Sequence, residues 1–284
     1  MSTCIVCDNT HFIALYDNLL LKCPTCGYIR PRSESKLEYI EEYYTEKYFL
    51  GGAYQNYLAD KEVIQNNFVR RLDQIHKFVN LERITNCLEI GAAYGFFGQV
   101  LKRRVNCEYI GYEIVPEAVA YACEQLHLNI VCNDFMNSEI DQNGKPYSDI
   151  FMWDVIEHLA HPEMVLEKVG RETCKGSRLY ITTGDIESLL ARMQKKNWRM
   201  LHESTHRHFF AKRSLNRILN RYGFKILFLN YTPVYRTIKQ IYYSLIIINK
   251  KPGRLHVSIY KRIPPNWYLK INLFDILFVI AEKT

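Results

Sequence analysis

Short apolar runs alternate with segments of helical periodicity through the middle of the sequence. The runs are rich in β-branched and aromatic residues and are short enough for strands, whereas the segments between them carry apolar residues every three or four positions. The predicted order is a strand, a Gly-containing turn and a helix in 85–104, further strands in 107–114, 129–134, 149–154 and 177–183, and helices in 116–126 and 164–174. Because strands that alternate with helices form a parallel sheet covered on both faces, we expect an α/β domain.

An amphipathic helix is predicted directly before this alternation, over 57–81. Its apolar residues recur at helical spacing: Leu58, Ile64, Phe68, Leu72, Ile75 and Val79. The stretch before the helix is dense in tyrosine: Tyr39, Tyr43, Tyr44, Tyr48, Tyr54 and Tyr57. We interpret 33–82 either as a helical linker that packs its aromatic rings on the main domain or as a lid, with "GGAY" at 51–54 as its hinge.

Length and composition predict one main domain with an appendage. The chain has 284 residues, 48% of them hydrophobic, which is enough for a sizeable core. No apolar run reaches about 18 residues, and no secretory signal is visible, so we expect a cytoplasmic protein without a transmembrane segment. A net charge of +7 fits either a solvated surface or attraction to nucleotide sugars, anionic lipid surfaces or RNA. Peripheral contact with a membrane therefore stays open.

Two Cys-x-x-Cys pairs stand at the front of the chain. Cys4 and Cys7 form the first pair, and Cys23 and Cys26 form the second. Four thiolates at this spacing are typical of one structural zinc site, whereas two disulfides, the alternative, are disfavoured in the cytoplasm. We therefore expect a zinc ribbon over 1–32, in which an apolar hairpin joins two turns and the metal stabilises a segment too small to fold alone.

Acidic residues stand beside the ends of the predicted strands, where a doubly wound sheet binds its ligand. The first turn reads Glu89-Ile-Gly91-Ala-Ala93-Tyr-Gly95, which is not the Gly-x-Gly-x-x-Gly pattern of a dinucleotide site. Glu89 suits a cationic amino-acid group, and Glu113 can accept both ribose hydroxyls. Asp134 can accept an adenine amino hydrogen. These groups suit a ligand with an ammonium, a sulfonium and a ribose but no phosphate, namely S-adenosylmethionine (SAM). The predicted cofactor-binding residues are Glu89, Gly91, Ala93, Gly95, Glu113, Asp134 and Asp154.

Four segments carry a resemblance to class I SAM-dependent methyltransferases over about residues 60–284. They are "LEIGAAYGFF", "GYEIVPEAV", "NDF" and "DIFMWDVIEHLAHP". The resemblance implies a Rossmann-like, doubly wound and mostly parallel seven-stranded sheet over 83–284, with "LFDILFVIAEKT" as the closing strand. Ala93 stands where many members have glycine, and its methyl group is tolerable if its φ is negative.

The stretch 182–226 narrows the resemblance. It is similar to a bacterial subfamily that carries a zinc ribbon in front and often belongs to surface-polysaccharide or deoxysugar pathways. The resemblance then implies a small polar acceptor, such as a sugar or nucleotide-linked sugar, methylated at a hydroxyl group or at a carbon. We interpret 231–265 as an insert that forms acceptor-side structure or a homodimer contact.

Histidines gather in "HESTHRHFF", residues 202–210, in the loop after the fifth strand. Methyl transfer to an alcohol needs a base, and histidine serves this purpose at neutral pH. Because a metal needs three or four convergent ligands, we favour a base over a metal site. The subfamily usually has His-x-His here, which implies His206 or His208 rather than His202.

A second candidate group is "DVIEHLAHP", which contains Asp154, Glu157 and His158. Asp154 ends the fourth predicted strand, and we expect it to contact either the methionine end of SAM or the acceptor. His158 is predicted to bond the backbone near the adenosyl group or to act as a base. Related quinone methyltransferases place Mg²⁺ on a similar acidic-x-x-Glu-His group, which is a third interpretation.

Three other functions compete with a sugar methyltransferase. A quinone or phenol O-methyltransferase shares the fold, and so does an rRNA or tRNA methyltransferase with a zinc ribbon in front. The "DVIEH" segment differs from the Asn-Pro-Pro-Tyr-like segment of base-amine methylases, which disfavours a nucleic-acid substrate. A non-catalytic partner subunit that binds SAM is the remaining alternative.

Overall fold

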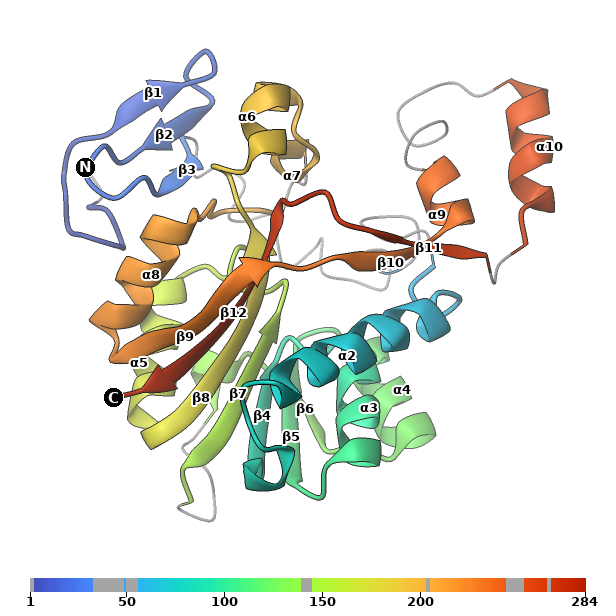
Figure 1. The fold of residues 1–284 in the computed structure, drawn as a ribbon, viewed down its shortest axis with the longest axis horizontal. Coiled ribbons are helices and arrows are strands. Elements are labelled where there is room, and N and C mark those ends of the chain that lie inside the picture. The colour runs from blue at the N-terminus through green and yellow to red at the C-terminus, as the bar shows by residue number, and fades with distance from the viewer. Residues whose placement is uncertain are drawn as a thin grey trace.

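A seven-stranded sheet forms the centre of the molecule (Figure 1). The computed structural model describes residues 3–32, 49, 56–138, 145–202, 205–243, 253–264 and 267–284. The strand order is β6-β5-β4-β7-β8-β12-β9. Five strands are parallel: β4 (Asn86–Ile90), β5 (Glu108–Glu113), β6 (Ile130–Cys132), β7 (Tyr147–Trp153) and β8 (Thr173–Gly184). The closing strand β12 (Ile276–Lys283) lies antiparallel between β8 and β9 (Phe224–Tyr231). The predicted mostly parallel seven-stranded sheet is therefore confirmed.

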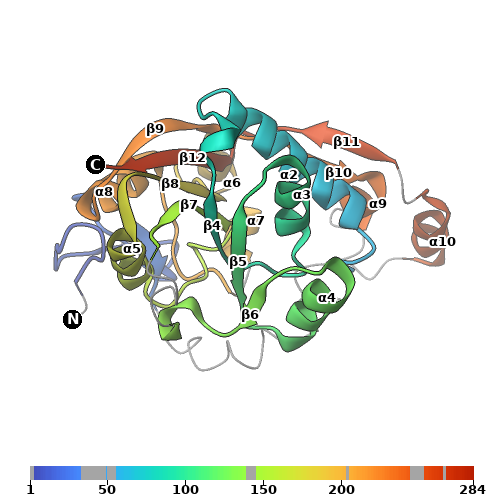
Figure 2. The ribbon, with the colours of Figure 1, turned by 90° about the horizontal axis from the view of Figure 1, so that it is seen from below.

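Helices cover both faces of this sheet (Figures 1 and 2). One face carries α2 (Lys61–His76), α3 (Phe96–Arg104) and α4 (Pro116–Leu126). The other face carries α5 (Pro162–Arg171) and α8 (Lys212–Arg221). Proline, whose missing N–H costs nothing in the first turn, begins both α4 and α5. The predicted helix over 57–81 is present as α2 but is shorter at both ends.

Alternate residues of β7 supply the two hydrophobic cores. Phe151 and Trp153 pack with the cluster beneath α2 and α3, whereas Ile150 and Met152 pack with the cluster beneath α5 and α8. All four side chains are buried. A strand with both faces buried explains why this run is continuously apolar and does not alternate with polar residues.

The N-terminal segment folds into a small antiparallel sheet at one end of the molecule (Figure 1). Its strands are β1 (Ile13–Leu15), β2 (Leu20–Lys22) and β3 (Ile29–Pro31). The predicted hairpin between the two cysteine pairs forms from β1 and β2. The predicted linker or lid and its hinge fall mostly in 33–48 and 50–55, which lie outside the described residues.

The remaining elements lie in connections around the sheet. Near the N-terminal sheet lie α6 (Leu189–Gln194), η4 (Lys195–Asn197) and α7 (Arg199–His202). Two further 3-10 turns, η2 (Leu81–Arg83) and η3 (Phe135–Asn137), precede β4 and follow β6. The connection from β9 to β12 contains β10 (Val234–Thr237), α9 (Ile238–Tyr242), α10 (Arg254–Arg262) and β11 (Tyr268–Ile271). Among the described residues, no helix has the length and apolar character needed to cross a bilayer.

Candidate active site and cysteine cluster

The loop between β4 and α3 follows a left-handed path at alternate residues. The φ angles of Gly91, Ala93 and Gly95 are +74°, +47° and +73°. Ala93 therefore does not meet the condition, a negative φ, under which its methyl group would be tolerated without strain. In the left-handed conformation a Cβ atom lies too close to the following carbonyl oxygen. This conformation at Ala93 therefore destabilises the folded state by about 1–2 kcal/mol. Its N–H donates to Glu113 Oε2 over 2.7 Å, and this bond holds the strained turn against the end of β5.

Glu113 is tied to the backbone on both of its oxygens. Besides Ala93, the N–H groups of Ile114 and Val115 donate to Oε1 over 2.9 and 3.0 Å. Burial raises the pKa of this carboxyl group, and the three backbone donors lower it. Since a carboxylate offers about four acceptor positions, the three bonds from described residues leave about one of them for a ligand.

Glu89 lies inside the domain and not at the open edge of the sheet. Its side chain is 2% exposed, and Tyr109 Oη donates a hydrogen bond to its Oε2. Burial raises the pKa of Glu89 to about 8 because the charged form loses its hydration, while the bond from Tyr109 acts in the opposite direction. A cation that approached Glu89 would favour the charged carboxylate, so the carboxyl group would lose its proton.

Two further predicted acceptors stand at the ends of β6 and β7. Asp134 is exposed and accepts a hydrogen bond from the Met136 N–H at 2.8 Å. Asp154 follows β7 with a φ of +56°, and its side chain is 42% exposed. Polar acceptors at neighbouring strand ends thus lie along the carboxyl edge, as predicted.

Arg71 is a site residue that the sequence prediction missed. It extends from α2 to Asp154, with Nη2 at 3.3 Å from Oδ2, and its guanidinium lies over the Trp153 ring at 4.9 Å. Arg71 is 5% exposed. Its position could have revealed it, because Arg71 stands beside Leu72 on the apolar face of the predicted helix. Arginines are seldom buried there unless they are paired with an acidic residue.

One ring nitrogen of His206 has a hydrogen-bond partner among the described residues. Its Nδ1 lies 2.8 Å from the Met200 carbonyl oxygen, which can only accept, so Nδ1 carries the hydrogen. Burial lowers the pKa of His206 to about 4, so the ring is neutral and Nε2 keeps its lone pair. The charge of Asp154 acts in the opposite direction. His206 lies close to Glu157, which follows Asp154 by three residues after the end of β7.

His208 is fully engaged in hydrogen bonds. Its Nε2 donates to the Leu159 carbonyl at 2.9 Å, and its Nδ1 accepts from Tyr28 Oη. Burial lowers the pKa of His208 to about 4. A ring with both nitrogens occupied cannot accept a further proton without losing a bond, so His208 holds the loop instead of facing an acceptor. His202 lies on α7 and is exposed.

Glu157 and His158 lie next to His206. The rings of His158 and His206 meet edge to face with centroids 4.6 Å apart, and one ligand atom from each of the three residues lies within 4.8 Å of the others. Burial lowers the pKa of His158, which bonds the Thr205 backbone. Within the described part of the chain, neither oxygen of Glu157 has a hydrogen-bond partner that meets normal geometry, although the nearby Thr183 hydroxyl acts to lower its pKa. Burial raises the pKa of Glu157 to about 8. Two imidazoles and one carboxyl group can either move protons or hold a divalent cation.

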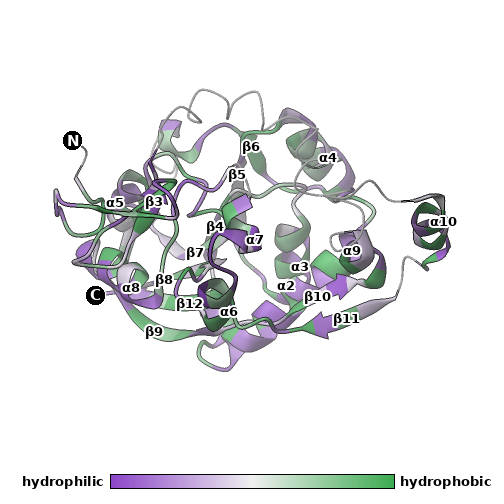
Figure 3. Ribbon diagram, turned by 90° about the horizontal axis from the view of Figure 1, so that it is seen from above, coloured by the Kyte–Doolittle hydropathy of each residue, from purple (hydrophilic) through white to green (hydrophobic). Residues whose placement is uncertain are grey.

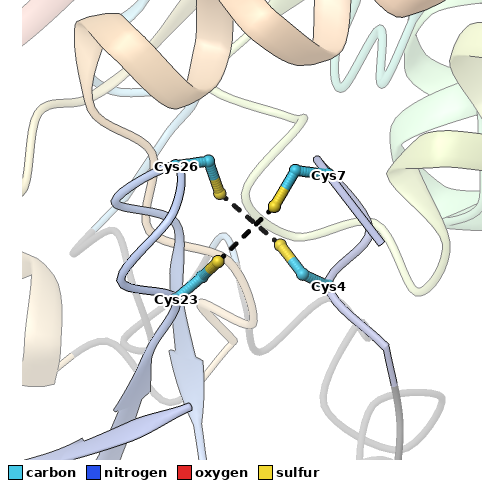
Figure 4. A group of neighbouring side chains, drawn as sticks. All are labelled: Cys4, Cys7, Cys23 and Cys26. Atoms are coloured by element: carbon cyan, nitrogen blue, oxygen red, sulfur yellow. Dashed lines mark hydrogen bonds between the residues drawn. The ribbon is translucent and has the colours of Figure 1, made fainter. Parts of the chain in front are cut away.

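The four N-terminal cysteines point toward one centre (Figure 4). Cys4 Sγ lies 3.5 Å from Cys26 Sγ, Cys7 Sγ lies 3.5 Å from Cys23 Sγ, and all four sulfurs lie within 4.8 Å of one another. A tetrahedron with Zn–S bonds of about 2.3 Å has edges of about 3.8 Å, so the arrangement fits a zinc ion. The hydrogen bond from Cys26 lowers the pKa of the Cys4 thiol to about 5, which favours a thiolate.

The cysteine-bearing sheet is attached to the histidine loop. Ile29 and Phe209 exchange two backbone hydrogen bonds of 3.2 and 2.9 Å, and Tyr28 is fully buried against His208 and Phe210. The Arg207 N–H in turn donates to the Glu157 carbonyl at 2.9 Å. One continuous set of contacts therefore joins the cysteine cluster to the group of Glu157, His158 and His206.

Comparison with known proteins identifies the domain. A family model described as a methyltransferase domain matches residues 60–228, more than half of the chain. No curated protein matches the sequence.

Solved structures show the same fold. A SAM-dependent methyltransferase of Thermotoga maritima has 18% identity and a TM-score of 0.51, covering 87% of this chain and 97% of its own. One from Archaeoglobus fulgidus has 18% identity and a TM-score of 0.52, with 80% and 99% covered. A Haloferax volcanii methyltransferase, solved in complex with the Trm112 methyltransferase activator, has 13% identity and a TM-score of 0.55, with 79% and 93% covered. With the family match over the sheet and its carboxyl edge, the chain belongs to the methyltransferase domain family and is a SAM-dependent methyltransferase.

Proposed function

We propose that the protein methylates a hydroxyl group of a sugar or nucleotide-linked sugar used in surface-glycan assembly, and that His206 is the base. The proposal is carried by His206, whose Nε2 has no hydrogen-bond partner among the described residues and whose ring lies beside His158 and Glu157. The subfamily resemblance over 182–226 supports the sugar acceptor. We further propose that residues 1–32 are a zinc ribbon and that 83–284 form the methyltransferase domain.

The residues that would hold SAM lie at successive strand ends. Glu113 would bind a ribose hydroxyl through its remaining acceptor position, and exposed Asp134 would accept from the adenine amino group. The turn of Gly91, Ala93 and Gly95 would bring backbone close to the cofactor, and Glu89 would balance its ammonium. When bound, SAM supplies a methyl group that its positive sulfur already activates.

On the acceptor side, the chain must position a hydroxyl and remove its proton. His206 would take the proton on Nε2 while the Met200 carbonyl holds the ring through Nδ1. Asp154, which Arg71 orients, would accept a second hydroxyl of the acceptor. His208 would keep the loop in place, because both of its nitrogens already have partners.

Methyl transfer from labelled SAM to a panel of acceptors tests this function. The panel contains nucleotide sugars, polysaccharide intermediates, catechols and total RNA, and product masses are measured for each. We expect one added methyl group on a sugar oxygen. Label only in catechol or RNA would refute the sugar acceptor and leave SAM-dependent transfer intact. SAM binding without label in any acceptor would favour a non-catalytic partner subunit.

His206→Ala tests the base. We expect kcat to fall by about 10²–10⁴-fold while the Kd for SAM stays unchanged, because the base touches only the acceptor. His202→Ala is the matched control, since His202 is exposed in the same loop region and should leave kcat unchanged. Full activity of His206→Ala would refute the assignment.

A second candidate chemistry is a divalent cation held by Glu157, His158 and His206, which their mutual distances favour. In that case His206 would be a ligand, and the cation would acidify the acceptor hydroxyl. The metal content of the purified chain separates the two chemistries. One ion per chain fits the cysteine cluster alone, whereas two ions that fall to one in Glu157→Gln would establish the second centre and replace the free base.

A further inference from the structure

The connection between β9 and β12 forms an arm at the end of the molecule opposite the cysteine cluster (Figures 1 and 2). We call the described residues 232–243, 253–264 and 267–271 the arm. β10 and β11 pair antiparallel, and the Ile238 N–H donates to the Trp267 carbonyl at 2.7 Å. Tyr242 Oη and His256 Nδ1 lie 2.8 Å apart, which joins α9 to α10. The arm is thus a built structure whose outer surface faces solvent.

That outer surface is unusually apolar. Of the sixteen exposed large hydrophobic side chains in the described chain, six belong to the arm: Leu255, Val257, Ile259, Trp267, Tyr268 and Leu269. Leu255 on α10 is 70% exposed and Ile259 is 40% exposed; these residues are four positions apart and share a helix face. Trp267 is 60% exposed and Leu269 is 53% exposed. Apolar surface gathered in this way marks an interaction site.

The arm lies within a longer stretch of the sequence that has no negative charge. From Ser204 to Phe274 there are fourteen Lys and Arg and no Asp or Glu, whereas the rest of the chain has 23 Lys and Arg against 30 Asp and Glu. The net charge of +7 therefore arises from a strongly basic C-terminal part and a mildly acidic remainder. Figure 3 shows both hydrophobic and hydrophilic residues on α10. The exposed basic residues of the arm include Lys261 and Arg262 at the end of α10 and Lys270 in β11.

Three partners can be weighed against this combination. A second copy would place one basic surface on another, which like charges oppose. RNA would pair with the basic residues and stack on aromatic rings, but it offers nothing to the exposed aliphatic side chains of Leu255 and Ile259. An anionic lipid surface satisfies both features, because acyl chains accept aliphatic side chains while headgroup phosphates attract Lys and Arg.

We propose that the arm docks on an anionic phospholipid surface. α10 lies in the headgroup layer with Leu255 and Ile259 toward the acyl chains, and Trp267 sits at the boundary between water and lipid. Lys261 and Arg262 follow on the same short helix, whose basic side chains extend to the phosphates while their aliphatic stems stay near the lipid. The docking goes beyond the proposed methyl transfer and does not depend on the acceptor.

Vesicle cosedimentation of the full-length protein tests the proposal. We expect binding to vesicles of phosphatidylcholine mixed with phosphatidylglycerol, weakening as salt rises, and little binding to phosphatidylcholine alone. Each basic residue near an anionic surface is worth about a fivefold change in affinity, so Lys261→Gln with Arg262→Gln should weaken binding about 25-fold. The matched control is Arg217→Gln with Lys225→Gln, which removes the same charge from exposed residues outside the arm and should have a smaller effect.

Tryptophan fluorescence gives a second measurement. The chain has three tryptophans, of which Trp153 and Trp198 are 7% and 1% exposed. A blue shift on adding anionic vesicles should therefore come from Trp267, and Trp267→Phe should remove it. Absence of binding at low salt, equal loss in both charge variants, or binding to RNA without binding to vesicles would overturn the proposal. A dimer that dissociates on Leu255→Ser would overturn it in favour of a second copy.

Discussion

Replacing Glu89 with glutamine should make the protein more stable, and the gain should grow with pH. Glu89 is 2% exposed, and burial raises its pKa from the ordinary 4.5 to about 8. At a pH between these two pKa values, Glu89 keeps its proton in the folded state and has released it in the unfolded state. The free energy of unfolding therefore falls as pH rises through this window. Glutamine imitates the neutral carboxyl group and can still accept the hydrogen bond from Tyr109.

The expected gain follows from the size of the pKa shift. At about 1.4 kcal/mol per unit, Glu89→Gln should match the natural protein near pH 4, exceed it by about 2 kcal/mol at pH 6, and exceed it by about 4 kcal/mol at pH 8. Urea unfolding followed by circular dichroism at each pH, with zinc held constant, measures the difference. Glu124→Gln, on the exposed face of α4, is the control and should change stability by less than about 0.5 kcal/mol at every pH.

If the difference in free energy of unfolding between Glu89→Gln and the natural protein did not vary with pH, the reasoning would be refuted. Glu89 would then be charged in the folded protein. A positive result has a consequence for the cofactor. If the ammonium of SAM approaches Glu89, the bound cation lowers the pKa of this carboxyl group, and SAM binding at about pH 7 should release a proton. Calorimetric titrations in buffers of different ionisation enthalpy measure that release, which should disappear in Glu89→Gln.

Three further changes test the geometry. Ala93→Gly should raise the free energy of unfolding by about 0.5–1 kcal/mol, because glycine accepts a φ of +47° without strain; urea unfolding would show a loss instead if this φ were wrong. Cys26→Ser should lower the zinc content by one ion per chain and make the N-terminal segment sensitive to proteases, whereas unchanged metal content would exclude a four-cysteine site. Tyr28→Phe keeps the ring but leaves Nδ1 of His208 without its donor, so it should cost about 1–3 kcal/mol in thermal or urea unfolding; no cost would show that this bond contributes nothing.

The contacts of Tyr28 give the cysteine cluster a role in the arrangement of the active site. Tyr28 follows Cys26 closely and is fully buried, so its position depends on the turn that the cysteines form. Because His208 accepts its hydrogen bond and precedes Phe209, which pairs with Ile29, the cluster holds the loop that carries His206. Disturbing the cysteines should therefore affect the acceptor side before it affects the carboxyl groups at the ends of β5 and β6.

Local patterns were sufficient to predict most elements of the sheet. Apolar runs bounded by turns correspond to β4, β5, β6, β7 and β8, and the three-to-four-residue period over 57–81 corresponds to α2. These predictions succeed because a strand or helix must bury one side of itself, and that requirement is visible in consecutive residues. The position of the acidic residues at strand ends was predictable for the same reason, since parallel strands end at one edge of the sheet.

Contacts between distant residues were not predictable in this way. His206 and His208 stand two positions apart and look equivalent in the sequence, yet one keeps a free nitrogen while Tyr28, 180 positions earlier, occupies the other. The φ of Ala93 is set by its bond to Glu113, and the pairing of Arg71 with Asp154 joins α2 to the end of β7. Each depends on packing between segments far apart along the chain.

The sequence by itself therefore determined the order of the elements from α2 to β8, the cysteine spacing and the set of groups available for chemistry. The tertiary structure decided which of these groups are free to react. The physical reason is that periodicity reports burial of a residue relative to its neighbours, whereas protonation and hydrogen bonding depend on which side chains meet. Glu89 illustrates the distinction. Its position before a glycine turn can be read from the sequence, but its raised pKa results from burial beside Tyr109.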